Sequence, residues 1–387
     1  MMGRLNSDPC LVLSAGEASG DLHGATLSAA VRKQAPDWRL IGIGGPRMAA
    51  AGVQLVADVT PHAPVGLIEP LASLPVLITA FCRLARALRT ERPRALILID
   101  FPDFNIPVAF VARLLGIPTF YFVPPDVWAW RPRRAWPLSK LGVHVLAAFS
   151  FEPAMYASTG MRVQFMGHPL LDVLPRDLTR AQARSALGVH ADTPLVGILP
   201  GSRPAEVNRL MPTMLKAACL IQQRRPDVQF LAAPAPVVGV PLVDRILRAA
   251  GSNVASVQGR AYELMAAADL LLVASGTATL EAALLRTPMV VCYRLSGVSA
   301  AIGRLLQRSP WLSLPNLLSG YAMVPELLQY DFTGERLADE ALDLLEHPEK
   351  LDAQRLAFQK LDDMLGEPGA GERAAEWVLR VVATPRG

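Results

Sequence analysis

Short, uninterrupted runs of apolar residues recur along the chain, and each is followed by a small-residue turn and a mixed or polar segment. Runs without polar alternation are typical of parallel strands that helices cover on both faces. The predicted strands are 10–15, 39–43, 95–99, 119–123, 163–166, 194–199, 228–232, 254–257, 270–273 and 288–293. The repeated order of strand, turn and helix predicts an α/β protein with doubly wound sheets.

A polar and then helical stretch, 174–193, interrupts this order, and the same pattern restarts after it. A chain of 387 residues suits two domains of ordinary size. We therefore expect two Rossmann-like doubly wound domains facing a cleft, which is the glycosyltransferase-B architecture. We place them at 1–178 and 179–345, and we expect the helical segment 346–387 to pack back on the N-terminal domain.

The most informative stretch, 270–285, reads LLLVASGTATLEAALL. It predicts a buried strand, a turn at Ser275, Gly276 and Thr277, and a helix start that Thr277 or Thr279 caps. Free N–H groups at a helix start suit a phosphate. Glu281, one turn into that helix, would accept hydrogen bonds from ribose hydroxyls, or it would merely favour the helix dipole.

Two further turns carry charged candidates. Arg203 follows the strand 194–199 within Pro200-Gly201-Ser202-Arg203, where it suits a bidentate contact with a diphosphate. Asp100 follows the strand 95–99 directly. Ligands of open α/β sheets bind at this end of the strands, so Asp100 is a candidate general base. The alternative for Asp100 is a carboxylate that caps its own loop.

The segment 65–82 reads VGLIEPLASLPVLITAFC, and Arg83, Arg86 and Arg89 follow it. An apolar segment beside basic residues is typical of a protein that lies on a membrane, although a core helix with a basic face has the same pattern. Its longest uncharged run is too short to span a bilayer. The segment 127–131, VWAWR, predicts a ligand contact, a lipid interface or simple packing.

Composition limits the function classes. The net charge of +4 and the pI near 9.0 are too mild to indicate a nucleic-acid partner, but they suit an anionic membrane surface or phosphorylated substrates. No GxGxxG, P-loop or DxD pattern occurs, so we expect no cofactor and no metal. The four scattered cysteines, Cys10, Cys82, Cys219 and Cys292, are predicted to be buried thiols of a reducing cytoplasm.

In order along the chain, the turns resemble those of the lipid-A-disaccharide synthase family. The resemblance runs nearly end to end and rests on GEASGD (16–21), GGP (44–46), DFPDFN (100–105), VWAWR (127–131), GHP (167–169), LPGSR (199–203), SGTATLE (275–281), LPN (314–316) and PELLQ (325–329). Three features depart from the family pattern: Pro124 replaces an expected Ser, Arg294 replaces the commoner Lys, and Pro70 and Pro75 interrupt the apolar segment.

The resemblance implies an inverting glycosyltransferase that moves 2,3-diacylglucosamine from UDP-2,3-diacylglucosamine to the 6-hydroxyl of 2,3-diacylglucosamine 1-phosphate (lipid X). The products would be lipid A disaccharide 1-phosphate and UDP. By motif position, Asp100 is the implied general base and Glu17 a second catalytic-site residue. The implied substrate-binding residues are Ser19, Arg203, Ser275, Gly276, Thr277, Thr279, Glu281, Asn316 and Gln329.

Both implied substrates carry acyl chains, so the resemblance favours the membrane interpretation of the apolar segment. The enzyme would then work in the cytoplasm, peripheral on the inner leaflet of the cytoplasmic membrane. The implied membrane-facing residues are Val65, Leu67, Ile68, Leu71, Leu74 and Leu77. Neither a metal nor a nucleic-acid partner is implied, and the oligomeric state stays open, with a homodimer as the alternative to a monomer.

Two other functions fit the same fold. One is another enzyme of this architecture, such as a UDP-N-acetylglucosamine 2-epimerase or a glycosyltransferase of peptidoglycan assembly. The other is a catalytically silent, membrane-peripheral binding protein that keeps the nucleotide turn. The acidic residue Asp100 argues against the silent protein, and the apolar segment argues against a soluble epimerase.

Overall fold

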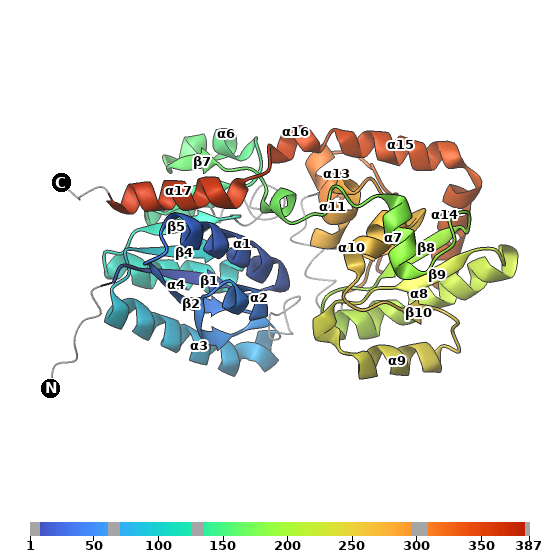
Figure 1. The fold of residues 1–387 in the computed structure, drawn as a ribbon, viewed down its shortest axis with the longest axis horizontal. Helices are drawn as coiled ribbons and strands as arrows, with labels where there is room; N and C mark the ends of the chain where they lie inside the picture. The colour runs from blue at the N-terminus through green and yellow to red at the C-terminus, as the bar shows by residue number, and fades with distance from the viewer. Residues whose placement is uncertain (1–7, 61–69, 125–134, 296–308, 384–387) are drawn as a thin grey trace. The chain divides into compact units, whose positions relative to one another are not determined.

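The structure is a computed structural model that describes residues 8–60, 70–124, 135–295 and 309–383 (Figure 1). The chain forms two compact units. Unit 1 contains the chain up to Val173 and again from Asp363 onward, and unit 2 is Leu174–Asp362. Each unit holds one parallel sheet, which confirms the predicted α/β class with two sheets.

The seven-stranded sheet of unit 1 runs in the order β3-β2-β1-β4-β5-β6-β7. Its strands are β1 (Cys10–Ala15), β2 (Arg39–Gly44), β3 (Gln54–Asp58), β4 (Ala95–Ile99), β5 (Thr119–Phe122), β6 (His144–Ala147) and β7 (Val163–Phe165). The chain moves outward from β1 to β3 and then returns to lay β4 against the other side of β1. The gap between β1 and β4 is therefore the topological switch point, where ligands of such sheets bind.

Helices cover both faces of this sheet (Figure 1). One face carries α1 (Ala18–Gln34), α2 (Pro46–Ala50) and α17 (Ala370–Ala383), and α17 packs along α1. The other face carries α3 (Pro70–Glu91) and α4 (Pro102–Leu114). Asp172 joins the last helix to the rest of unit 1, because its carboxylate accepts hydrogen bonds from the first backbone N–H groups of α17. The shorter helices α5 (Ala135–Lys140) and α6 (Glu152–Tyr156) lie beside β6 and β7 in the chain.

The six-stranded sheet of unit 2 runs in the order β10-β9-β8-β11-β12-β13. Its strands are β8 (Leu195–Leu199), β9 (Gln229–Ala232), β10 (Ala255–Ser256), β11 (Leu270–Ala274), β12 (Met289–Tyr293) and β13 (Glu326–Leu328). Here the chain moves outward from β8 to β10 and returns to β11 on the other side of β8. The switch point of unit 2 therefore lies between β8 and β11.

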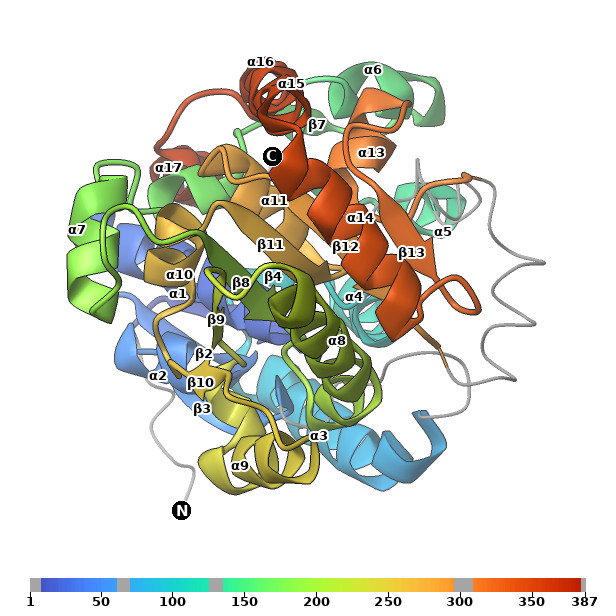
Figure 2. The same cartoon turned by 90° about the vertical axis from the view of Figure 1, so that its right-hand side faces the viewer.

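Figure 2 shows α8 and α14 in front of the strands of unit 2. The helices α8 (Pro204–Arg224), α9 (Val240–Ala249) and α14 (Gly334–Glu346) share one core with the sheet. On the other face, Leu264 of α10 packs where Gly197 leaves room beside Leu271. The remaining helices are α7 (Arg180–Leu187), α10 (Ala261–Ala267), α11 (Thr277–Leu284), α13 (Leu314–Ser319), α15 (Pro348–Gln359) and α16 (Asp362–Leu365).

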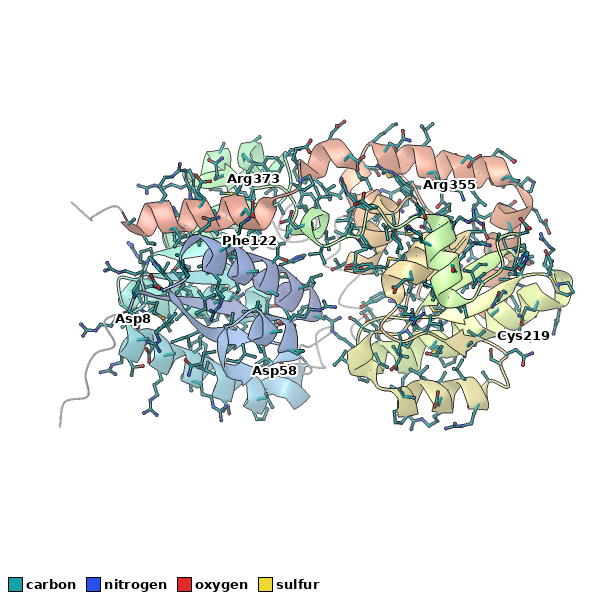
Figure 3. The ribbon with its side chains drawn as sticks, in the orientation of Figure 1. Asp8, Asp58, Phe122, Cys219, Arg355 and Arg373 are labelled. Atoms are coloured by element: carbon teal, nitrogen blue, oxygen red, sulfur yellow. The ribbon has the colours of Figure 1, made fainter. Side chains whose placement is uncertain are left out.

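The structure differs from the sequence predictions in several places. The segment 325–329 was expected to begin a helix but contains strand β13, and the loop expected at 314–316 is helix α13. The helix α1 begins at Ala18, four residues earlier than the predicted Leu22. Of the cysteines, Cys10 and Cys292 are buried as predicted. Cys82 and Cys219 are exposed, because each lies on the solvent side of a long amphipathic helix, as Figure 3 shows for Cys219.

Candidate functional site

The switch point of unit 1 brings two predicted site residues to adjacent strands. Glu17 follows β1 and is the N-cap residue of α1, and Asp100 follows β4. Both side chains are partly exposed at the carboxyl edge of the sheet. Ser19 lies in the first turn of α1, where it is also partly exposed. The structure therefore places Glu17, Ser19 and Asp100 at the edge where a ligand of this sheet would bind.

The backbone of Asp100 is held in an uncommon conformation. Asp100 and Phe101 have φ angles of 48° and 52°, a left-handed region that non-glycine residues rarely adopt. Two buried side chains donate to the Asp100 carbonyl oxygen: Asn105 Nδ2 at 2.6 Å and Tyr121 Oη at 2.7 Å. The Asn105 amide also bonds Ser14 at the end of β1, at 2.5 Å from Ser14 Oγ to Asn105 Oδ1. This network fixes the strained turn that presents Asp100.

The two turns at this switch point also pack on each other. The ring of Phe101 lies over Gly16 so closely that a β-carbon at Gly16 would come within 2.0 Å of it. Asp21, at the end of the same motif, accepts hydrogen bonds from the N–H groups of Gly45, Arg47 and Met48 at 2.8–3.0 Å. The carboxylate of Asp21 therefore caps α2, which explains why GEASGD and GGP occur together.

In unit 2, the turn after β8 presents Arg203. Arg203 is the N-cap residue of α8, and its side chain is 25% exposed. The buried Glu206 supports the turn: its carboxylate accepts from Ser202 N at 3.1 Å and lies 3.7 Å from the Arg203 guanidinium. Gly201 has a φ of 117° and passes so close to Glu206 that a β-carbon would contact its carboxylate. Glu206 thus orients a guanidinium beside a helix N-terminus, which suits a diphosphate.

The turn after β11 lies next to the turn after β8, because β8 and β11 are paired. Its N-cap residue is Gly276, with φ 152° and ψ −164°, and Thr277 is already helical. The prediction that Thr277 or Thr279 caps the helix is therefore wrong. Thr279 is fully buried, and its N–H and hydroxyl both donate to the Gly276 carbonyl. It stabilises the turn, while Ser275, Gly276 and Thr277 line the accessible side.

Glu281 is partly exposed on α11, one turn after Thr277. The phenolic hydroxyl of Tyr262, on α10, donates to Glu281 Oε1 at 2.9 Å. This contact restrains the rotamer of the carboxylate and is compatible with both alternatives, so a contact of Glu281 with ribose hydroxyls stays a prediction. A restrained carboxylate near a helix N-terminus is the arrangement expected for binding ribose hydroxyls.

Asn316 and Gln329, the last two predicted substrate-binding residues, differ in their surroundings. Asn316 is completely buried, and its amide bonds Met323 N, Val324 N, Val324 O and Glu326 Oε1, which uses both its donors and its acceptor. It holds α13 against β13, and a direct contact with substrate stays a prediction. Gln329 follows β13 at the carboxyl edge with a φ of 54°. Arg294, at the position where the family more often has Lys, donates to the Gln329 and Phe332 carbonyls.

The apolar segment is described only in part. Val65, Leu67 and Ile68 lie outside the described residues, as does the motif 127–131, and the side chain of Leu71 is not described either. The helix α3 runs through Pro75 without a break. Leu74 is 45% exposed, but Leu77 packs partly against the core of unit 1, because it lies about 60° further round the helix, toward the buried stripe of Ala80 and Leu84. The structure thus leaves Leu74 exposed and turns Leu77 inward.

Four residues that support the site were not singled out from the sequence: Asn105, Tyr121, Glu206 and Tyr262. Asn105 is the last residue of the motif 100–105 and Glu206 lies three residues after the motif 199–203, but nothing in the sequence indicates which backbone groups they bind. Within the described ranges, no group of three His, Cys, Asp or Glu side chains could hold a metal ion. In the same ranges, no helix has the length and apolar character needed to cross a bilayer.

Comparison with known proteins agrees with these motifs. A family model described as lipid-A-disaccharide synthetase matches residues 11–376. The lipid-A-disaccharide synthase of Syntrophus aciditrophicus is 42% identical over 98% of this chain and 99% of its own length. That of Geobacter metallireducens is 38% identical over 97% of this chain and 98% of its own.

Solved structures give the fold. A UDP-GlcNAc 2-epimerase from Neisseria meningitidis bound to UDP-GlcNAc superimposes with a TM-score of 0.66 at 14% identity, covering 96% of this chain and 100% of that one. At that identity the similarity concerns architecture alone, and it agrees with the two parallel sheets found here. The family match and the full-length relatives carry the assignment instead: the chain belongs to the lipid-A-disaccharide synthase family.

Proposed function

We propose that this protein transfers 2,3-diacylglucosamine from UDP to the 6-hydroxyl of lipid X, as the family assignment implies. The observation that carries the proposal is the pair of turns at the switch point of unit 2. There Arg203 and the Gly276 turn follow adjacent strands, and each begins a helix whose free N–H groups favour phosphate oxygens. Such a site would hold the UDP diphosphate and stabilise charge as UDP departs.

Asp100 would act as the general base. Inversion requires one in-line attack, so a single carboxylate suffices to take the proton from the acceptor hydroxyl. The network of Asn105 and Tyr121 supports this role, because it fixes the backbone from which the carboxylate projects. Glu17, which follows the adjacent strand β1, would complete the acceptor side of the site.

A test is product formation from UDP-2,3-diacylglucosamine and lipid X in detergent, with EDTA present. Disaccharide 1-phosphate and UDP appearing in equal amounts would support the transfer and a mechanism that needs no metal. Activity that is lost in EDTA and restored by Mg²⁺ would keep the transferase but overturn the metal-free mechanism. Absence of product with or without Mg²⁺ would favour the epimerase or the silent binding protein.

The protein would reach its acylated substrates at a membrane surface. Along the exposed side of α3, Leu74 and Ile78 (45% and 54% exposed) are followed by Cys82, Arg86 and Arg89 at helical spacing. The neighbouring α4 exposes Phe110 and Leu114. Apolar side chains flanked by arginines match the interface of an anionic bilayer.

The membrane proposal can be tested by sedimentation with phosphatidylglycerol vesicles. The double substitution Ile78→Asp and Leu114→Asp should lower the bound fraction severalfold without lowering the melting temperature, since both side chains are exposed. Leu356→Asp, an equally exposed leucine on α15, is the matched control. Equal binding by all three proteins would overturn the proposal. Homodimer formation stays a prediction, to be tested by the mass of the protein in detergent.

A further inference from the structure

A cavity of about 520 Å³ lies within unit 2 at the opposite edge of the sheet from the nucleotide turns. Its lining includes Ala268, just before β11, and Thr287, just before β12, whereas the site residues follow these strands. The five residues of β11 rise roughly 17 Å at about 3.3 Å per residue, so a ligand at the Gly276 turn does not fill this cavity. It is a separate space.

Guanidinium groups dominate its lining. We call it the arginine cavity, and its charged residues are Arg176, Arg180, Arg286, Arg355 and Asp362. Figure 3 marks Arg355 on α15. The ion pairs around the cavity are Arg180–Asp269, Arg184–Asp269, Arg286–Asp362 and Arg355–Asp352. Arg176 has no ion pair among the described residues. Arginines therefore outnumber aspartates, and the cavity attracts anions.

One ion pair of the cavity is incomplete. Arg286 Nη1 and Asp362 Oδ1 are both buried, and neither has a hydrogen-bond partner in the described part of the structure. Buried polar atoms normally have partners, because a buried donor or acceptor without one is costly. Both atoms are closed off from the cavity, so an anion there would contact the exposed part of the Arg286 side chain and pair with Nη1 once this ion pair opens.

The backbone of Arg286 adds a second observation. Arg286 has a φ of 61° at the end of α11, where its N–H donates to Ala283 O and the N–H of Thr287 donates to Ala282 O. This is the Schellman arrangement, in which the left-handed residue is usually glycine. Glycine would fill the position without strain, so the backbone does not require an arginine there. The side chain has another use, and it lines the cavity.

The arginines are also not needed to neutralise the helix ends nearby. The last carbonyls of α10 already accept hydrogen bonds, from Thr287 Oγ1 to Met265 O at 2.6 Å and from Arg184 Nε to Ala267 O at 3.0 Å. Those of α11 are bonded through the Schellman motif. Each of the two helix C-termini acts like a partial charge of about −0.5. Together they offset less positive charge than the arginines supply, so the cavity stays positive.

We propose that the arginine cavity binds a phosphate-bearing anion, independently of the nucleotide turns and of the proposed transfer reaction. Arg176 and Arg180 lie where the chain enters unit 2, and Asp362 lies where it leaves. A phosphate held by these residues ties the two connecting segments together. Its binding is expected to slow hydrogen exchange at 176–180.

The test is calorimetric titration of the full chain with inorganic phosphate, at constant ionic strength set by chloride. Arg176→Gln and Arg286→Gly should each weaken phosphate binding at least tenfold. Arg286→Gly should keep the melting temperature, because it relieves a left-handed residue and loses a half-exposed ion pair. Arg224→Gln, which breaks an exposed pair elsewhere in unit 2, is the matched control.

Three outcomes would overturn the proposal: no phosphate binding by the unmodified chain, unchanged affinity in both cavity variants, or loss of binding in Arg203→Ala alone. The last outcome would show that phosphate binds at the nucleotide turn instead of the cavity. If Arg286→Gly fails to fold, Arg176→Gln carries the test, because its exposed side chain has no ion pair to lose.

The phosphate could belong to a lipid headgroup or to a free ester. Sedimentation with phosphatidylglycerol vesicles, against phosphatidylcholine vesicles, separates these sources. A lower bound fraction for both cavity variants than for Arg224→Gln would identify a lipid headgroup. Unchanged sedimentation together with weakened phosphate binding would identify a free phosphate ester.

Discussion

The hydroxyl of Tyr121, buried in strand β5, donates to the backbone carbonyl of Asp100 at 2.7 Å. The bond joins a side chain inside the sheet to the residue at the edge of the adjacent strand, where φ is 48°. The position of the proposed general base therefore depends on a side chain that is buried inside the sheet. Asn105 makes the second such bond.

Removing this hydroxyl should affect catalysis more than binding. We expect Tyr121→Phe to lower kcat by about fivefold with KM little changed, because a buried hydrogen bond contributes about 1 kcal/mol and here restrains the base. Steady-state kinetics with UDP-2,3-diacylglucosamine and lipid X would measure both constants. Tyr321→Phe, a partly exposed tyrosine of unit 2, is the control. A rise in KM alone would contradict the positioning role.

Asp100→Asn keeps the shape of the proposed base but removes its charge. General bases contribute typically 10²–10⁴-fold, so turnover should fall by about that factor. Affinity for UDP, measured by calorimetry, should stay within about twofold, since the nucleotide turns belong to unit 2. Near-normal turnover would show that another group takes the proton.

Arg203→Ala, in contrast to Asp100→Asn, should lower the affinity for UDP. Hydrogen bonds to charged groups contribute about 1.5–3 kcal/mol, so the loss of the guanidinium should weaken UDP binding roughly 10- to 100-fold. The same calorimetric titration measures this change. Arg209→Ala, nearly two turns further along the same helix, is a useful comparison because it removes an equal charge. Equal losses in the two variants would indicate a general charge effect instead of a specific contact.

A buried histidine pair makes stability depend on pH. The rings of His23 and His168 lie 5.8 Å apart, edge to face, and both side chains are almost fully buried. Burial, with a smaller contribution from the charge of Arg47, lowers the pKa of His23 to about 4. Burial and the neighbouring His23 also lower the pKa of His168.

The direction of this pH dependence follows from comparing proton binding by the folded and the unfolded chain. The unfolded chain takes up these protons near pH 6.5, but the folded chain takes up the His23 proton only near pH 4, so protonation favours unfolding. Stability should be complete above pH 6.5 and fall as pH decreases toward 4, by about 3 kcal/mol from His23 alone. Urea unfolding at several pH values would measure the loss. His23→Gln should flatten the curve, and the exposed control His190→Gln should not.

Much of the fold could be predicted from the sequence, because buried parallel strands are apolar without alternation. Two of the strands that were missed lack this signal, and the third, β6, carries it over only three residues, 145–147. β3 is an edge strand whose residues are half-exposed, and β6 and β13 have only four and three residues. In β13 the run Glu326–Leu328 is as compatible with a helix as with a strand. It forms a strand because it pairs with β12, and pairing between distant segments cannot be read from the local sequence.

The turns that carry the candidate site residues could be predicted, but the residues that hold those turns in place could not. Asp100, Arg203 and Glu281 follow strands or begin helices, which the local sequence reveals. The partners that hold them come from distant segments: Tyr121 lies on the adjacent strand and Tyr262 on a preceding helix. Thr279 was wrongly predicted as a helix cap for a similar reason, because a threonine in a small-residue turn faces either outward or the core, and its contact with substrate stays a prediction. Packing turns it to the core.

Unit 1 is assembled from two pieces of chain, and this bears on how the protein is made. The helix α17 completes the core around α1, and Asp172 caps it, yet all of unit 2 is synthesised between Asp172 and α17. At roughly 5–20 residues per second, that delay lasts on the order of 10–40 seconds. During this interval α17 has not yet been synthesised, so the apolar face of α1 has no helix to pack against. Unit 2, which is continuous, can finish folding before the unit that begins the chain.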